Sequence, residues 1–413
     1  MHHGIFHYLE RVVHGLRGYL HPRMISSYCE LRDRPLPEDA SRRNLAVYDF
    51  HSIDIDKVMG RYLFHIVRDF MTLGYFPVYT SRFKFLASFH RKKYKQLLLE
   101  TPLHTTAPNK LPERSFIYIT DHPTRSPENA EQIIRVNYEH RRAKADHESE
   151  FPFFVHPEVS IQKDFPPRPG TLTERPIKLL FAGNTEERQY TKGNVKGKFG
   201  LIPRNEVVNL VKKHLSEGHV KEVSCEQDLL TPSAHIFQCV ESDRYRIPAD
   251  QWMSTLQRAD FFLCCPGVSM PLCHNLIEAL ACGTIPILQY SHYMNPELIN
   301  GENCLTYHDR PSLARAIDLA ARMPVSALRI MRENALSYYH RYLSEGRFAE
   351  QILTSGTKET NLLLNAYRIP RAAGTNLTTS NKTTVSPSHT APRTPSGSGH
   401  ESRARKDLLR TSC

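Results

Sequence analysis

The sequence predicts an α/β fold with two domains, because a strand–helix pattern occurs twice and the chain is long. Short apolar runs alternate with helical patterns from residue 44, and the same alternation restarts at residue 176. Strands that are joined through helices form parallel sheets with right-handed connections. The chain of 413 residues also exceeds what one hydrophobic core usually serves. We therefore expect two α/β domains that face a cleft.

The first domain is expected over residues 44–160. Four apolar runs have the length and composition of strands: Leu45–Phe50, Phe76–Tyr79, Ser115–Thr120 and Phe151–His156. A helical pattern separates the first two strands and ends at Gly74, and a basic helix is predicted over Phe83–Leu99. Acids and histidines stand at the carboxyl ends of these strands, where an open α/β sheet binds its ligands.

The second domain is expected over residues 176–325. Its predicted strands are Pro176–Ala182, Asp260–Cys265 and Thr284–Leu288, and its predicted helices are Arg204–Leu215, Gln251–Ala259 and His274–Ala281. A basic loop that contains glycine is predicted after Asn184. Helices over 311–323 and 325–350 end the folded part, so that residues 326–369 are expected to form C-terminal helices.

Three further segments flank or join these domains. Residues 1–30 predict an amphipathic basic helix, which either packs on its own domain or lies on anionic lipid. Residues 161–175 are rich in proline and charge and predict a linker. Residues 370–413 are rich in Ser, Thr, Pro and Gly and predict a disordered tail.

Cysteine usage and hydropathy predict a cytoplasmic protein. The nine cysteines are an odd number and several lie in apolar runs, which is typical of reduced thiols. No run approaches the roughly 18 apolar residues that span a bilayer, and the first thirty residues do not have the pattern of a signal peptide. We expect a cytoplasmic location, at the inner face of the membrane if residues 1–30 contact lipid.

The net charge of +11 favours anionic partners. A diphosphate donor, an acidic glycan, an anionic membrane surface and nucleic acid all carry such charge. The sequence contains no RNA-recognition signature and no zinc-finger spacing, so we expect no nucleic acid partner.

The segment Ala259–Leu288 contains the pattern that points most directly to chemistry. It predicts a buried strand, a Pro-Gly turn and a helix that begins at His274. Gly267 would let a phosphate approach without a Cβ, and backbone N–H groups near Ser269 would face that phosphate. Glu278 lies one turn after His274, where a carboxylate could accept both hydroxyls of a ribose. The segment therefore predicts nucleotide recognition.

This segment resembles the donor-binding signature of GT-B glycosyltransferases, both of the exostosin-like family and of the glycogen-synthase-like group. That resemblance implies two Rossmann-like domains and a nucleotide-sugar donor, which is a substrate, with no cofactor. It assigns Glu278 to the ribose, and it places Gly267 and Ser269 at the diphosphate. The other donor-binding candidates lie at the start of the same helix and in the loop that opens the donor domain: His274, Asn275, Gly183, Asn184, Arg188 and Lys192.

Met270 marks a departure from the glycogen-synthase-like pattern. Retaining enzymes of that group have a second glutamate eight residues before the one that Glu278 matches, and this chain has Met270 there. The difference favours the exostosin-like family, which tends to invert, so the resemblance implies an inverting enzyme. An inverting enzyme needs a general base for the acceptor hydroxyl. The candidates stand at or near predicted strand ends in the first domain: His51, Asp54, Asp121, His122 and His156.

Two pairs of ionisable residues each allow more than one interpretation. Asp121 and His122 are adjacent, which suits a base with an orienting partner, and equally a helix cap or a loop hydrogen bond. Asp54-Ile-Asp56 matches the metal-binding pattern of GT-A enzymes, but acids are also favoured where a helix begins. We expect no metal, because a helix start and basic side chains can stabilise a leaving diphosphate.

The predicted function is sugar transfer from a nucleotide sugar to a glycan or lipid-linked acceptor, as in polysaccharide biosynthesis. Two alternatives stay open. The chain could be a non-catalytic module that binds nucleotide sugars, or a sugar-nucleotide epimerase with the GT-B shape.

Overall fold

The computed structural model describes residues 22–36, 42–139, 141–167, 174–191, 194–231, 235–268 and 270–364. Residues 1–21 of the predicted N-terminal helix, part of the predicted linker and the predicted tail lie outside these ranges. The candidates Lys192 and Ser269 lie outside them as well. Within the N-terminal segment, Pro22–Leu31 forms helix α2.

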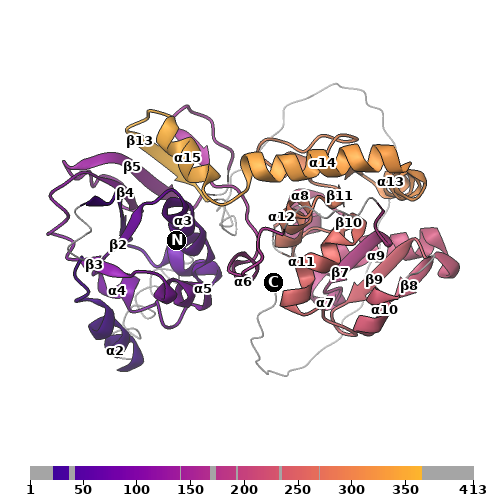
Figure 1. The fold of residues 1–413 in the computed structure, drawn as a ribbon, viewed down its shortest axis with the longest axis horizontal. Helices are drawn as coiled ribbons and strands as arrows, with labels where there is room; N and C mark the ends of the chain where they lie inside the picture. Colours follow the sequence, from indigo (N-terminus) through magenta and orange to yellow (C-terminus); the bar gives the residue numbers. More distant parts are fainter. Residues whose placement is uncertain are drawn as a thin grey trace, which may run out of the picture. The chain divides into compact units, whose positions relative to one another are not determined.

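Seven parallel strands form the first sheet, in the order β3-β2-β1-β4-β5-β13-β6 (Figure 1). Their bounds are β1 Leu45–Asp49, β2 Phe76–Thr80, β3 His104–Thr106, β4 Phe116–Thr120, β5 Ala130–Asn137, β6 Glu148–Glu150 and β13 Glu359–Leu363. Ala46 pairs with both Pro77 and Ile117, so β1 lies between β2 and β4. The reversal of strand order beside β1 is the Rossmann-like feature that places ligands at the carboxyl ends of β1 and β4.

Helix α3 (Arg61–Thr72) follows β1 after the 3₁₀ segment η2 (Asp54–Gly60) and buries an apolar face. The prediction of one continuous basic helix over Phe83–Leu99 is wrong. The segment consists of α4 Phe83–Leu86, α5 Lys93–Gln96 and the 3₁₀ turn η3 Leu97–Glu100. The Lys95 ammonium is buried and donates to the Phe85 carbonyl at 2.7 Å. The chain therefore folds back around a buried cation here, which one straight helix would not permit.

The strand predicted over Phe151–His156 is also wrong, because this segment is an irregular connection. Phe151 and Phe154 are buried against other rings, with centroid distances of 4.7 Å from Phe151 to Phe348 and 4.0 Å from Phe154 to His65. Aromatic residues in such a run satisfy a strand pattern and a packed connection equally well. Helix α6 (Pro157–Ser160) follows.

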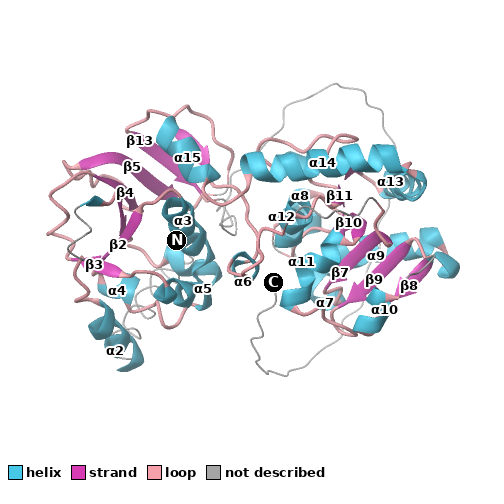
Figure 2. Cartoon of the chain, in the orientation of Figure 1, coloured by secondary structure: helices cyan, strands magenta, loops and turns pink. Residues whose placement is uncertain are grey.

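Six parallel strands form the second sheet, in the order β12-β11-β10-β7-β9-β8. The strands are β7 Ile177–Gly183, β8 Val220–Glu222, β9 Phe237–Glu241, β10 Ala259–Cys264, β11 Ile285–Leu288 and β12 Leu305–Thr306. The α-helices between them are α7 Glu187–Thr191, α8 Asn194–Phe199, α9 Arg204–Leu215, α10 Glu226–Leu230, α11 Ala249–Gln257 and α12 His274–Ala281, and α13 Arg310–Arg322 follows the last strand. Figure 2 shows helices flanking the strands of each sheet. The predicted fold class, α/β with two Rossmann-like units, is confirmed.

The C-terminal part differs from the helices that were predicted over residues 326–369. Helix α14 (Val325–Tyr342) ends before Gly346, whose φ of +90° lies in the left-handed region. Helix α15 (Arg347–Thr354) then leads to β13, which pairs with β5 and β6 of the first sheet. The residues after the second sheet therefore complete the first one. Among the described residues, no helix is long and apolar enough to cross a membrane.

Candidate functional site

The turn between β10 and α12 contains an internal hydrogen bond from Gly267. The Gly267 N–H donates to the carbonyl of Pro271 at 3.2 Å. A Cβ at this position would lie 2.8 Å from the Met270 carbonyl oxygen. The turn therefore needs glycine for its own geometry, and its Gly267 N–H is already used within the protein.

Two helices of the second sheet begin without a side-chain cap. Cys273 precedes α12 and Pro203 precedes α9, and neither side chain accepts a hydrogen bond from its helix. The first N–H groups of a helix need partners from outside it, and the helix dipole favours an anion there. Both helix starts are suited to a negatively charged ligand.

Arg204, the first residue of α9, joins these two helix starts. It is only 5 % exposed, and its Nη2 approaches the Cys273 Sγ at 3.5 Å. Its Nη1 approaches the Asn184 carbonyl oxygen at 3.5 Å, and its guanidinium lies over the Tyr190 ring at 5.3 Å. A Cβ at Gly183 would lie 3.2 Å from the Arg204 Nη1. The structure thus brings Gly183, Asn184 and the start of α12 together around one buried cation.

The charge of Arg204 has no carboxylate beside it within the described part of the chain. Its Nε is buried and lacks a hydrogen-bond partner among those residues. Burying an unpaired charge is costly, so such a group is typical of a site whose partner is an anion from outside the protein. The predicted cations were Arg188 and Lys192, not Arg204; Arg188 lies exposed on α7, and Lys192 lies outside the described residues. The available signal was an arginine directly after Pro203 at the start of a predicted helix.

Glu278 lies one turn after His274 on α12 and is buried, with 4 % of its surface exposed. One carboxylate oxygen accepts from the His156 N–H at 2.8 Å, and the other accepts from the Trp252 Nε1 at 2.6 Å. Burial raises the pKa of Glu278, while these two hydrogen bonds and the charge of Arg61 lower it. These two hydrogen bonds therefore link α12 to α11 and to the segment before α6. The resemblance assigns Glu278 to a ribose, yet both of its oxygens already have donors within the protein.

His274 is a neutral imidazole with a defined tautomer. Its Nδ1 lies 2.8 Å from the Phe154 carbonyl oxygen, so this nitrogen carries the proton. Its Nε2 then accepts from the Arg61 Nη1. Burial, together with the positive charge of Arg61, lowers the pKa of His274 well below its usual range. His274 thus connects α12 to α3, and Asn275 beside it is partly exposed.

His156 is a helix cap at some distance in sequence from the other candidate bases. Its Nδ1 accepts from the Glu158 N–H at 3.3 Å, so its Nε2 carries the proton and faces the Tyr94 hydroxyl at 3.0 Å. Burial lowers the pKa of His156 to about 4. The imidazole is therefore neutral near pH 7, and both of its nitrogens have partners.

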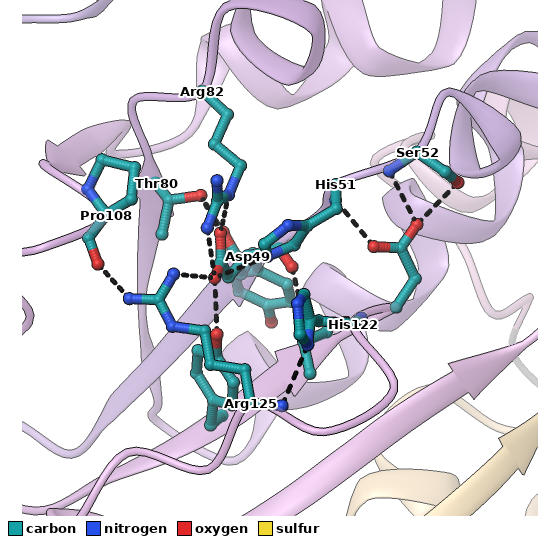
Figure 3. Close-up of polar contacts among 12 residues, drawn as sticks. Asp49, His51, Ser52, Thr80, Arg82, Pro108, His122 and Arg125 are labelled. Carbon is teal, nitrogen blue, oxygen red and sulfur yellow. Dashed lines mark hydrogen bonds and ion pairs between the residues drawn. The ribbon is translucent and has the colours of Figure 1, made fainter.

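Asp49, at the end of β1, organises the carboxyl edge of the first sheet (Figure 3). Its fully buried carboxylate accepts from Arg82, from Thr80 Oγ1 at 2.7 Å and from Arg125 Nη1 at 3.1 Å. Burial by itself would raise the pKa of Asp49, but hydrogen bonds from Arg82, Tyr118 and Thr80 hold it well below its usual range. Asp49 was missed because it forms part of an otherwise apolar strand pattern.

His51 is the candidate base that the structure places against Asp49. Its Nε2 lies 3.2 Å from the Asp49 Oδ2, so Nε2 carries the proton and Nδ1 holds the basic lone pair. Burial lowers the pKa of His51, and the Asp49 charge partly offsets that effect. The side chain is 28 % exposed, so solvent and a ligand can reach it. An imidazole supported by a buried carboxylate can accept a proton at neutral pH.

Asp121 and His122 have separate positions in the same cluster. The Asp121 carboxylate accepts from the His51 N–H at 2.6 Å and from the Ser52 hydroxyl at 2.7 Å, which fixes the loop after β1. The His122 Nδ1 accepts from the Arg125 N–H at 2.9 Å, and its ring centroid lies 4.5 Å from that of His51. Both side chains make the loop hydrogen bonds that were the alternative interpretation of this adjacent pair.

The two acids of the Asp54-Ile-Asp56 sequence have different partners. Asp54 forms an ion pair with Lys57 at 2.6 Å. Asp56 is buried and forms an ion pair with Lys95 at 2.8 Å. Asp56 thus balances a buried cation.

No family model matches the chain, and no curated protein matches it in sequence. Several solved structures resemble parts of it at low identity. An alpha-glucosyltransferase in complex with UDP and DNA is 11 % identical, with a TM-score of 0.38 over 76 % of this chain and 100 % of that chain. A glycosyltransferase from Rickettsia africae ESF-5 is 10 % identical, with a TM-score of 0.39 over 76 % and 98 %. Sucrose-phosphate synthase from Thermosynechococcus elongatus is 11 % identical, with a TM-score of 0.35 over 76 % and 98 %. At these values the likeness supports no conclusion about activity.

Proposed function

We propose that the protein transfers a sugar from a nucleotide-sugar donor to an acceptor hydroxyl. One observation carries this proposal: the buried Arg204 guanidinium has no described carboxylate beside it and touches the starts of α9 and α12. A cation at two uncapped helix starts is suited to a ligand with more than one negative charge. The diphosphate of a nucleotide sugar has that charge.

The donor diphosphate would lie against Arg204 and the start of α12, beside the partly exposed residues Gly183, Asn184 and Asn275. Cations and helix starts would then stabilise the charge that develops on the leaving diphosphate, so we propose a reaction without a metal. Arg188, which lies exposed on α7, remains a further candidate cation for the diphosphate. A ribose contact at Glu278 would have to compete with Trp252 and the His156 N–H.

His51 is the base that we propose, acting with inversion. The acceptor hydroxyl would give its proton to His51 Nδ1 as its oxygen bonds to the anomeric carbon of the sugar. The bond from that carbon to the diphosphate oxygen breaks, and the diphosphate leaves with the electron pair. Asp49 would stabilise the imidazolium that forms, while Asp121 holds the loop that carries His51.

We further propose membership of the exostosin-like family and an acceptor that is a glycan or a lipid-linked glycan. These proposals rest on the segment Ala259–Leu288 and on Met270. The described cysteines are free thiols, which supports a cytoplasmic location. Contact with the inner face of a membrane would occur through residues 1–30.

The test is a panel of nucleotide sugars measured by thermal shift and by release of nucleoside diphosphate. A donor at about 100 times its Kd should stabilise the wild-type protein by about 2.7 kcal/mol. Arg204→Gln should lose that stabilisation, while Arg329→Gln, a change at an exposed position on α14, should keep it. His51→Gln should keep donor binding and lower kcat by about 10² to 10⁴.

The other outcomes separate the alternatives. Binding with the donor left intact would indicate a non-catalytic module, and a changed sugar with the diphosphate retained would indicate an epimerase. If no nucleotide or nucleotide sugar stabilises the wild-type protein, the proposed function is wrong.

A further inference from the structure

Arg61 is a second arginine at the start of α12, and it comes from the first sheet's own helix α3. It is the first residue of α3, and its Nη1 donates to the His274 Nε2. Its Nη2 lies 3.3 Å from the Tyr94 hydroxyl, and its guanidinium carbon lies 5.0 Å from the Tyr94 ring centroid. These contacts hold the guanidinium in place without cancelling its charge.

The described residues provide no ion pair for Arg61. Its Nε is buried and has no hydrogen-bond partner within the described ranges. The buried carboxylate of Glu278 attracts Arg61, but both of its oxygens already accept hydrogen bonds from Trp252 and His156. Arg61 therefore resembles Arg204 in being a positively charged group whose hydrogen-bond partners are uncharged.

The two arginines approach consecutive residues. Arg204 contacts Cys273 and Arg61 contacts His274, the residue before α12 and the first residue within it. No side chain caps this helix, so its first N–H groups add a partial positive charge. The positive charge of two guanidinium groups and a helix start is more than a single phosphate monoester needs. It matches the negative charge of a diphosphate.

We propose that Arg61 is a second diphosphate ligand, supplied by α3 to the donor site that α9 and α12 form. This inference rests on the proposed function. Charge on the diphosphate increases as the bond to the sugar breaks, so a cation beside it stabilises the transition state more than the bound donor. Arg61 would thus make donor binding depend on both sheets, and it would increase kcat as well as affinity.

The experiment measures binding of inorganic pyrophosphate by calorimetry, since this probe carries the diphosphate and no base or sugar. Arg61→Gln should weaken binding by about tenfold to hundredfold, the range expected for a hydrogen bond to a charged group. Arg61→Lys should restore part of the loss, and Arg204→Gln should weaken binding at least as much. Arg329→Gln is the matched control and should bind as the wild type does. Arg61→Gln should weaken the binding of orthophosphate less than it weakens the binding of pyrophosphate.

The outcomes separate this inference from the proposed function. If Arg204→Gln abolishes pyrophosphate binding and Arg61→Gln binds like the wild type, the role of Arg61 is overturned and the donor site stands. If the wild type binds no pyrophosphate, or if neither substitution matters, the donor site itself is wrong. Tyr94→Phe covers the case in which Arg61→Gln fails to fold. It removes the hydroxyl that holds Arg61 and keeps the charge, so it should weaken binding severalfold, and unchanged binding in this folded variant would count against Arg61.

Discussion

At the scale of single residues, the buried ionisable groups have different roles. Lys95 is fully buried and has three partners: Asp56 at 2.8 Å, the Phe85 carbonyl and Ser88. Arg204 is nearly as buried but has no described carboxylate partner. A satisfied buried charge is typical of a structural group, whereas an unsatisfied one is typical of a binding site. Composition alone could not separate these two cations.

Asp69 on α3 gives a prediction about pH. Its buried carboxylate accepts from the Gly346 N–H at 2.9 Å, and burial raises the pKa of Asp69 to about 7, above its usual 3.8. The folded protein therefore binds this proton more tightly than the unfolded chain does. The contribution of Asp69 to the free energy of unfolding is greatest below pH 3.8 and is lost as the pH rises to about 7.

Asp69→Asn should remove this dependence, because the amide oxygen can still accept from Gly346 and carries no charge. We expect the variant to be more stable than the wild type at pH 8. The difference between the two proteins should shrink by up to about 1.4 kcal/mol per pH unit as the pH falls toward 4. Urea denaturation at a series of pH values measures this, and two parallel stability curves would contradict the prediction.

At the scale of elements, glycine decides where one predicted helix becomes two. Residues 325–350 have a continuous helical pattern, but Gly346 has a φ of +90° and precedes α15. A Cβ at Gly346 would also lie 3.0 Å from the Thr72 Cγ2 on α3. The break between α14 and α15 therefore depends both on local backbone freedom and on a neighbour that is far away in sequence.

Gly346→Ala should destabilise the protein by about 1–2 kcal/mol, the usual cost of a side chain in the left-handed region. Gly218→Ala is the matched control, since Gly218 has no positive φ and a Cβ there would meet nothing within 4 Å. That control should be neutral or slightly stabilising. Thermal and urea unfolding of both variants provides the measurement, and equal effects of the two substitutions would show that the backbone at Gly346 is unstrained.

At the scale of the whole molecule, the first sheet is completed by residues that follow the second sheet. β13 lies between β5 and β6, and Gln132 donates to the carbonyls of Ile352 and Thr357. Leu362, Leu363 and Leu364 are fully or almost fully buried. The first sheet therefore cannot be complete without the C-terminal part of the described chain.

Deletion of residues 355–413 should remove β13 and destabilise the first sheet. The three leucines alone would account for roughly 5–9 kcal/mol, at about 1.5–3 kcal/mol for each buried side chain. The deletion also leaves β5 with an open edge, which favours aggregation. Deletion of residues 365–413 retains β13 and should leave the melting temperature unchanged. Equal melting temperatures for the two truncated proteins would contradict this account.

The sequence by itself determined the fold class and most of the elements near the candidate donor site. Helices α9 and α12 have the predicted bounds, and β7 and β10 agree to within one residue at each end. These elements were predictable because hydrophobic periodicity and turn residues act within a few positions of one another. The same local logic explains the errors, since the aromatic run 151–156 satisfies the pattern of a strand.

Only the tertiary structure decided which side chains meet. Arg61 and His274 are 213 positions apart, and Arg204 and Cys273 are 69 apart, so no local pattern relates them. The same holds for Glu278, since its donors Trp252 and the His156 N–H lie on other segments of the chain. Periodicity indicates which face of an element is buried, but the partner of a buried charge depends on how separate elements pack. The sequence therefore determined the scaffold and led to a hypothesis about the ligand, whereas packing between elements decided which side chains lie together at the candidate site.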